Sequence, residues 1–181
     1  VDFKSKEEAL SFSESVLLAE LKVNSVETKP SKRSPKAPFI TSTLQQEASQ
    51  KLGFSVKQTM SIAQNLYREG AITYMRTDSL NLSELAIAAA QEEIVSKFGS
   101  KFHQARRYKT NSSGAQEAHE AIRPTDLTKP SILGLDDQST KLYSLIYKRT
   151  LASQMSDAQL QKTKININIS KRSEHFIADG E

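Results

Sequence analysis

A tyrosine and an arginine two residues apart form the pair in this sequence that is best suited to phosphate chemistry. Tyr74 and Arg76 lie in residues 72–79 (ITYMRTDS), where the composition of residues 71–75 predicts a short strand. A phenol, which ionises near ~10, becomes a better nucleophile and leaving group than serine beside a cation. Because residues two apart share one face of a strand, Arg76 would lie beside Tyr74, and its guanidinium could donate two parallel hydrogen bonds to phosphoryl oxygens. The spacing alone is also typical of a packed tyrosine near a surface Arg–Asp bridge.

A histidine between acidic residues is the second candidate group. His119 lies in residues 115–124 (AQEAHEAIRP), followed by an arginine and a proline. Its imidazole could donate a hydrogen bond to a phosphate oxygen. A histidine of a short helix that bonds a backbone carbonyl would give the same pattern, so both interpretations stay open.

Metal chemistry has weak support in the sequence. The chain has no cysteine, and its three histidines lack the spacing of a zinc-binding helix. The adjacent acids Asp136 and Asp137 fit the start of a helix, and no cluster of three acids indicates a magnesium site. We therefore expect no metal site formed by this chain alone.

Composition and charge favour an acidic partner only slightly. The 181 residues carry 25 Lys+Arg against 21 Asp+Glu, a net charge of +4. No apolar run is long enough to span a membrane, and residues 1–20 do not read as a signal peptide, which predicts a cytoplasmic protein. Residues 101–109 (KFHQARRYK), with Arg106 and Arg107, combine positive charge and aromatic rings without an acid. They are a candidate lining for a single nucleic-acid strand, or a solvated loop.

The predicted elements alternate between helical and strand-like regions. Apolar spacing and capping residues predict helices that begin near Ser5, Ser42, Ser55, Ser83 and residue 138. A short strand is expected around residues 21–26, followed by a Pro- and Lys-rich linker over residues 29–38, because proline removes backbone donors. Alternating Ile165, Ile167 and Ile169 predict a half-buried strand that pairs with residues 176–178.

These elements predict an α+β fold in three sequence segments. Residues 38–157 form a mainly helical domain with a helix-turn-helix-like element and short strands. Residues 1–37 and 158–181 form the two parts of a β-containing domain into which the helical domain is inserted.

Three blocks together resemble a known family. Residues 38–48 (PFITSTLQQEA), 72–79 and 115–125 are similar, in order and spacing, to signature blocks of bacterial type IA DNA topoisomerases. The resemblance implies that Tyr74 attacks a single-stranded DNA phosphodiester and becomes linked to the 5′-phosphate. It implies that Arg76 positions this tyrosine and neutralises phosphate charge, and that His119 contacts the scissile phosphate region. Other motif positions are expected to shape the site or the DNA path: Ser42, Thr43, Gln45, Thr77, Asp78, Glu117 and Arg123.

The resemblance also implies partners that this chain lacks. Family enzymes carry an N-terminal acidic domain that holds Mg²⁺, and a further domain that closes a ring around DNA. The β-containing domain would be part of the family's β-rich arch, or hinge. We therefore expect a fragment of a nucleoid-associated enzyme that relaxes negatively supercoiled DNA without ATP. The isolated fragment should bind single-stranded DNA weakly and fail to relax plasmid.

Two other functions remain open at this point. A pure DNA-binding module would use the helix-turn-helix-like segment 43–69 and prefer duplex DNA. A hinge or protein-interaction module would bind no nucleic acid, with or without salt.

Overall fold

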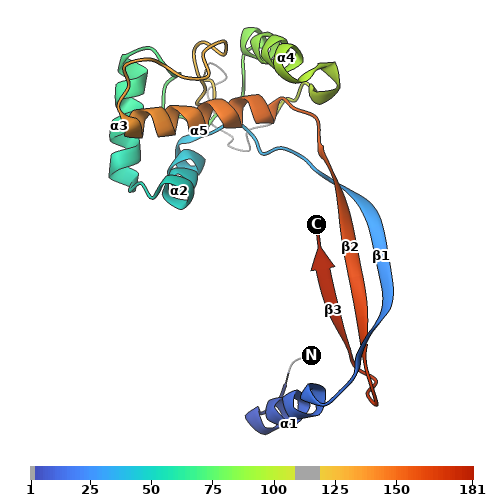
Figure 1. Cartoon of the computed structure of the whole chain (residues 1–181). Helices are drawn as coiled ribbons and strands as arrows, with labels where there is room; N and C mark the ends of the chain where they lie inside the picture. The colour runs from blue at the N-terminus through green and yellow to red at the C-terminus, as the bar shows by residue number, and fades with distance from the viewer. Residues whose placement is uncertain (1–2, 109–118) are drawn as a thin grey trace. The chain divides into compact units, whose positions relative to one another are not determined.

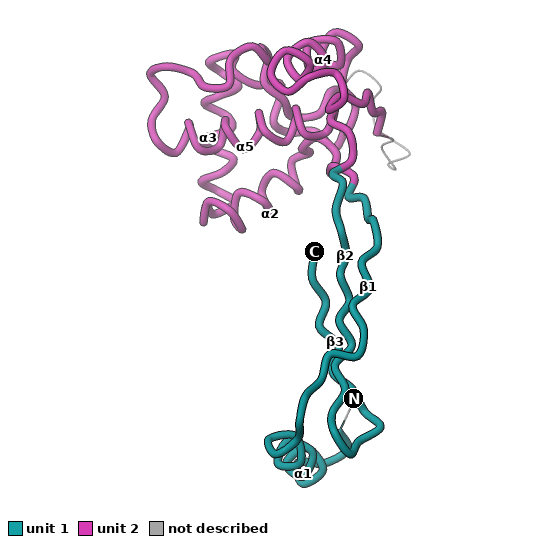
Figure 2. The backbone as a smooth tube through the Cα atoms, turned by 45° about the vertical axis from the view of Figure 1, so that its right-hand side comes forward, with its two compact units in different colours: residues 1–33, 158–181 teal, residues 34–157 magenta. Residues whose placement is uncertain are grey.

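The computed structural model describes residues 3–108 and 119–181, which fold as an α+β protein with two compact units. Residues 1–33 and 158–181 form the sheet unit, and residues 34–157 form the helical unit (Figure 2). The helical unit is therefore a single continuous stretch between the two parts of the sheet unit.

The sheet unit consists of one helix and three antiparallel strands (Figure 1). Helix α1 spans Lys6–Leu17, and the Ser5 side chain caps it by accepting a hydrogen bond from the Glu8 amide, as predicted. The strands are β1 (Leu21–Arg33), β2 (Ala158–Ile169) and β3 (His175–Gly180), in the order β1-β2-β3. The β2–β3 hairpin confirms the predicted strand pair.

Strand β1 is longer than predicted. Residues 29–33 belong to the strand, with Pro30 opposite Gln161, so the expectation of a linker from residue 29 is wrong for these positions. Because β1 is an edge strand, the missing proline donor can face away from the ladder. The apolar side chains of β1 and β2 share one face, since Val23 pairs with Ile167 and Val26 with Ile165.

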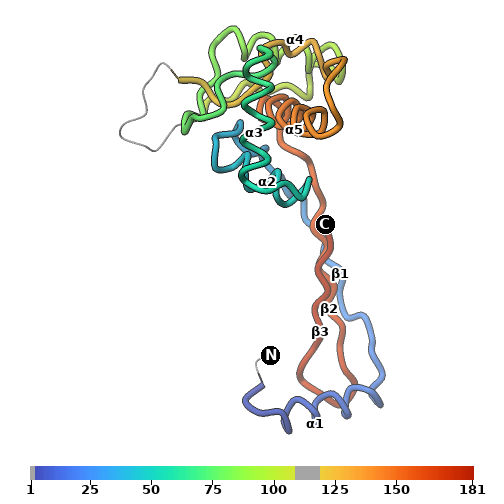
Figure 3. Tube along the Cα trace, turned by 90° about the vertical axis from the view of Figure 1, so that its left-hand side faces the viewer, coloured from blue at the N-terminus to red at the C-terminus, as the bar shows by residue number. Residues whose placement is uncertain are grey.

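Helix α1 lies at one end of the sheet (Figure 3), and side-chain contacts join the two. The rings of Phe12 and Phe176 meet edge-on, with their centroids 6.3 Å apart. Arg172 stacks over the Phe12 ring and donates a hydrogen bond to the Ser15 hydroxyl. These contacts fix α1 to the β2–β3 hairpin.

The helical unit contains α2 (Thr41–Leu52), α3 (Val56–Arg68), α4 (Glu84–Phe98), a 3₁₀ turn at Ser100–Phe102 and α5 (Asp137–Ser153). Ser55, Ser83 and Asp136 cap the starts of α3, α4 and α5, which confirms the starts predicted for these helices. Helix α2 differs, because it begins at Thr41, and the Thr43 hydroxyl accepts a hydrogen bond from the Ile40 amide. The helix therefore starts before residues 42–45, where the sequence predicted its cap, and Ile40 occupies the N-cap position.

Apolar faces of these helices meet around α5, which packs against α2, α3 and α4. Fully buried side chains at the centre come from every α-helix of the unit and from the segments before and between them, and include Phe39, Leu44, Leu66, Ile72, Met75, Ile94, Ile122, Leu142 and Ile146. None of the helices in the described part of the chain combines the length and apolar character needed to cross a membrane.

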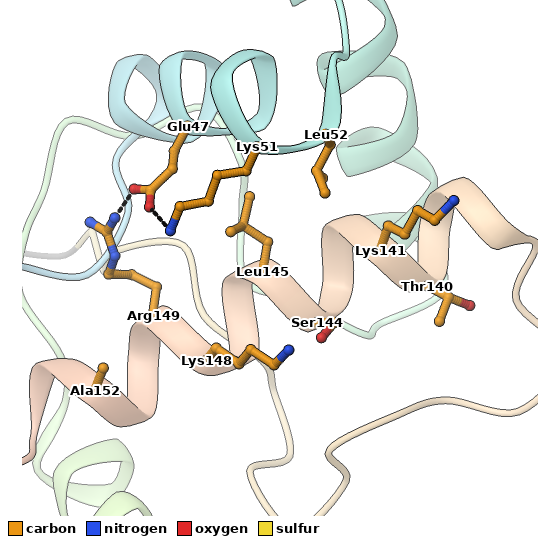
Figure 4. Close-up of a pocket in the computed structure, with 10 residues that line it drawn as sticks. All are labelled: Glu47, Lys51, Leu52, Thr140, Lys141, Ser144, Leu145, Lys148, Arg149 and Ala152. Atoms are coloured by element: carbon orange, nitrogen blue, oxygen red, sulfur yellow. Dashed lines mark ion pairs between the residues drawn. The ribbon is translucent and has the colours of Figure 1, made fainter.

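A buried ion pair joins α2 to α5 (Figure 4). Glu47 lies between Arg149 and Lys51, and the side chains of Glu47 and Arg149 are each only 11% exposed. The guanidinium of Arg149 also stacks on the Phe39 ring at 4.3 Å and donates a hydrogen bond to the Ala37 carbonyl. Arg149 therefore holds the segment that leads into α2.

Candidate functional site

The segment that carries Tyr74 and Arg76 is not the strand that the sequence predicts. Only one isolated bridge, between Ile72 and Pro124, involves it among the described residues. Its backbone instead uses scattered partners: the Thr73 amide donates to the Arg123 carbonyl at 2.9 Å, and no neighbouring strand runs beside it. Residues 71–75 have the composition of a strand, but their backbone groups form single hydrogen bonds with segments that are distant in sequence.

The alternation of exposed and buried side chains nevertheless persists along this segment. Met75, Thr77 and Ser79 are buried, whereas the three residues between and before them are exposed: Tyr74, Arg76 and Asp78. The exposed positions are those predicted for chemistry, and the buried positions anchor the segment to the core.

The Thr41 hydroxyl connects the first block to the second. It donates to the Met75 carbonyl at 2.9 Å and accepts from the Thr77 amide at 2.9 Å, while the Thr41 amide donates to the Thr77 carbonyl. These bonds flank Arg76 on both sides along the chain. Thr41 is therefore a positioning residue that sequence analysis missed, and its only signal was a hydroxyl within the first block.

The Thr73 hydroxyl connects the second block to the third. It donates to the Ala121 carbonyl at 2.7 Å and accepts from the Arg123 amide at 2.9 Å. The Ile122 amide in turn donates to the Phe39 carbonyl at 2.8 Å, which closes the connection back to the first block. All three blocks are thus linked by hydrogen bonds, although up to 83 residues separate the bonded positions in sequence.

A shallow groove of about 550 Å³ lies where the three blocks meet. Its lining includes six of the residues predicted from sequence, and its complete lining is Ile40, Thr41, Ser42, Gln45, Arg76, Thr77, Asp78 and His119. The N-terminal part of α2, the extended segment and the third block therefore supply hydroxyl, amide, guanidinium, carboxylate and imidazole groups to one surface.

The side chain of Tyr74 lies outside this lining and contacts α3. Tyr74 is 44% exposed, and its ring meets that of Tyr67 edge-on, with centroids 5.2 Å apart and planes 67° apart. Tyr74 is thus partly open to solvent, and it lies two residues before Arg76, which lines the groove.

Arg123 has an internal partner in the structure. Its guanidinium pairs with Glu120 at 2.6 Å and donates to the Pro124 carbonyl, and the Glu120 carboxylate also accepts from the Ser83 amide. Burial opposes ionisation of Glu120, but the bonds from Arg123 and Ser83 outweigh it and hold the pKa of Glu120 below its ordinary value. The pair anchors the third block to the start of α4.

Other predicted DNA contacts are engaged in bonds of their own. Arg106 pairs with Asp157 and donates to the Met155 carbonyl, and its side chain is only 19% exposed. Arg107 pairs with Glu84 on the surface, and Thr43 bonds to the Ile40 backbone. The predicted roles of these three residues stay predictions, and Glu117 lies outside the described residues.

Across residues 3–108 and 119–181, no three His, Asp or Glu side chains come together as ligands for a metal ion. The groove has one carboxylate, from Asp78, and one imidazole, from His119. Because Mg²⁺ prefers several oxygen ligands in octahedral geometry, these residues do not fit a magnesium site by themselves.

Comparisons with known proteins agree on one family. Residues 1–181 match the family model described as DNA topoisomerase. The chain is 50% identical over 147 residues to DNA topoisomerase 1 of Zymomonas mobilis, covering 80% of this chain and 12% of that protein. It is 54% identical over 147 residues to DNA topoisomerase 1 of Mycolicibacterium smegmatis, covering 78% of this chain and 16% of that protein.

A solved structure extends the similarity to the fold. The full-length topoisomerase I of Thermotoga maritima aligns with a TM-score of 0.78 and 38% identity, over 98% of this chain and 31% of that one. The chain thus spans less than a third of this structure and 12% to 20% of the length of the curated relatives.

Proposed function

This chain belongs to the bacterial type IA DNA topoisomerase family, and from that premise we propose that it carries the nucleophile of a strand-passing enzyme. In this proposal the parent protein relaxes negatively supercoiled DNA by cutting one strand, passing DNA through the break and resealing it. The predicted cytoplasmic, nucleoid-associated location belongs to the same proposal.

The proposed reaction is a transesterification at phosphorus, in which one phosphate ester bond forms and another breaks. The phenolic oxygen of Tyr74 attacks a phosphodiester of a single strand and loses its proton, while the bond from phosphorus to the deoxyribose 3′-oxygen breaks. The leaving 3′-oxygen takes up a proton, and the tyrosine remains bonded to the 5′-phosphate. Resealing reverses these steps, so the energy of the broken bond is retained in the phosphotyrosine and no ATP is required.

The groove at the junction of the three blocks is the observation that carries the proposal. It places Arg76 and His119 in one lining, and Tyr74 is exposed two residues before Arg76. Phosphoryl transfer depends mainly on positioning and on stabilising charge on the phosphate oxygens. A guanidinium and an imidazole are suited to that task, while Ser42, Gln45, Thr77 and Asp78 would border the strand.

The rest of the machinery would come from other parts of the parent protein. Magnesium ions, which the family resemblance implies, have no ligand set in the described residues and would be held by other parts of the parent protein. An acidic metal-binding domain and a ring-closing domain are proposed as partners, together with single-stranded DNA. We accordingly propose that the isolated chain does not relax plasmid DNA.

Trapping of the covalent adduct tests the nucleophile. The full-length parent and its Tyr74→Phe variant are incubated with a single-stranded oligonucleotide labelled at its 3′ end, then denatured and separated by electrophoresis. The parent should retain label on protein, because the 5′-phosphate of the labelled piece is bound to tyrosine. The variant should retain none while its thermal unfolding is unchanged. Labelled protein in the Tyr74→Phe sample would place the nucleophile elsewhere.

A DNA-binding module without catalysis is a second candidate, because residues 53–55 join α2 and α3 as in a helix-turn-helix. The exposed side of α3 includes Lys57, Ser61 and Asn65. Competition between duplex and single-stranded oligonucleotides for the isolated chain distinguishes it, since this module would prefer the duplex. Failure to bind either, at any salt concentration, would favour a hinge or interaction module.

A further inference from the structure

Tyr67 is the aromatic neighbour of the proposed nucleophile. It lies in the last turn of α3, is 40% exposed, and meets the Tyr74 ring edge-on at a centroid distance of 5.2 Å. We propose that Tyr67 is a positioning residue, whose ring holds the phenol of Tyr74 in its reactive orientation. The inference rests on the proposed function of Tyr74.

The backbone between the two tyrosines fixes their approach. Gly70 adopts a left-handed φ of +70°, and its amide donates to the Tyr67 carbonyl at 2.9 Å. The Ala71 amide then donates to the Leu66 carbonyl at 2.8 Å, which turns the chain back along the end of α3. A residue with a Cβ would be strained at Gly70, so this turn is specified by the sequence.

Buried side chains anchor both tyrosines on either side. Leu66 and Ala71 are 0% and 7% exposed, and Ile72 and Met75 are each 1% exposed. The Cα positions of the two tyrosines are therefore set by the core, whereas their rings project from it. The core therefore fixes the backbone of both tyrosines but not the orientation of their rings.

The ring contact is what orients the Tyr74 side chain. Within the described residues, no hydrogen bond holds the Tyr74 hydroxyl, and the Tyr74 ring pairs with the ring of Tyr67. An exposed tyrosine without such a neighbour samples several side-chain rotamers. Edge-to-face pairs favour one arrangement, and reaction rates fall when an attacking group spends less time in reactive geometry.

The expected effect is moderate. Loss of an aromatic pair corresponds to a roughly threefold to tenfold change in the population of the held orientation. The rate of cleavage at saturating DNA should fall by about that factor, while DNA affinity stays the same, because Tyr67 acts on the nucleophile and not on the strand.

Three substitutions of Tyr67 in the full-length parent distinguish the contribution of its aromatic ring from those of its hydroxyl group and of its side-chain volume. Tyr67→Phe keeps the ring, Tyr67→Leu keeps apolar volume without it, and Tyr67→Ala removes both. Val56→Ala is the matched control, because Val56 is 56% exposed on the same helix. Each variant is measured for single-turnover adduct formation on a 3′-labelled oligonucleotide, for oligonucleotide affinity and for thermal unfolding.

We expect Tyr67→Phe and Val56→Ala to cleave at the parent rate, and Tyr67→Leu and Tyr67→Ala to cleave about threefold to tenfold more slowly. Rescue by phenylalanine distinguishes positioning from a purely structural role. Equal rates for all variants would overturn the inference, as would a Phe variant as slow as the Ala variant or a loss confined to affinity. An adduct that persists in Tyr74→Phe would instead overturn the proposed function itself.

Discussion

The two units of this chain are stabilised in different ways. In the described part of the helical unit, fourteen hydrophobic side chains are exposed by 1% or less and form the core, and the three sequence blocks are linked by hydrogen bonds. In the described part of the sheet unit, Ile169 alone is buried, and the ladder of three strands provides most of the order. The groove and the candidate nucleophile lie on the unit with the core, because catalytic groups need a scaffold that holds them to within fractions of an ångström.

This difference between the units predicts that truncating a side chain costs more stability in the helical unit than on the exposed positions of the sheet unit. All five tyrosines of the chain lie between residues 67 and 147, so tyrosine fluorescence during urea unfolding reports on the helical unit alone. Hydrogen exchange of the β2 amides reports on the sheet unit.

Truncation of Ile122 should have the largest effect on stability. Ile122 is fully buried, and Ile122→Ala should lower the free energy of unfolding of the helical unit by about 2–5 kcal/mol, because it removes apolar contacts and leaves a cavity. Urea unfolding followed by tyrosine fluorescence measures the change. Ile122→Val is the control, with an expected loss of about 0.5–1.5 kcal/mol. An alanine variant as stable as the valine variant would contradict the picture of a tightly packed core.

Removal of the Glu120 charge should have an intermediate effect that depends on pH. The pKa of Glu120 is lower in the folded state than its ordinary value of 4.5, so its ionisation stabilises the fold above that value. This stabilisation is lost as the pH falls from 4.5 through the folded pKa. Glu120→Gln should therefore cost on the order of 1–2 kcal/mol at pH 7, and less at pH 3.

The exposed Glu92 of α4 supplies the matched control for this pH series. Glu92→Gln should leave the urea midpoint within error of the parent at both pH values. A Glu120→Gln deficit that is the same at pH 3 and pH 7 would show that the carboxylate charge does not hold the third block in place.

Truncation on the open sheet should have the smallest effect. Val26 is 59% exposed, and Val26→Ala should change stability by no more than about 0.5 kcal/mol. Protection of the β2 amides from hydrogen exchange measures it. Ile169→Ala, at the buried position of the same face, should reduce protection far more. Equal losses from the two variants would mean that burial does not distinguish positions within this sheet.

Local signals explain which elements could be predicted. Ser55, Ser83 and Asp136 cap helices because their side-chain oxygens satisfy free amides within three residues, an interaction that needs no tertiary context. The alternation of Ile165, Ile167 and Ile169 likewise fixes a strand period. The predicted strand at residues 71–75 failed because its backbone groups bond to separate segments and form no continuous ladder: the Thr73 amide donates to the Arg123 carbonyl, whereas the Met75 carbonyl accepts from the Thr41 hydroxyl.

The sequence by itself determined the helices, the caps of all of them except α2, the strand pair near the C-terminus and, through its three blocks, the family. Only the tertiary structure decided that Ser42, Arg76 and His119 line one groove, that Arg106 and Arg123 are bound to internal acids, and that Tyr67 contacts Tyr74. The physical reason is range: caps and periodicity act over a few residues, whereas side-chain partners are chosen when the core brings distant segments together.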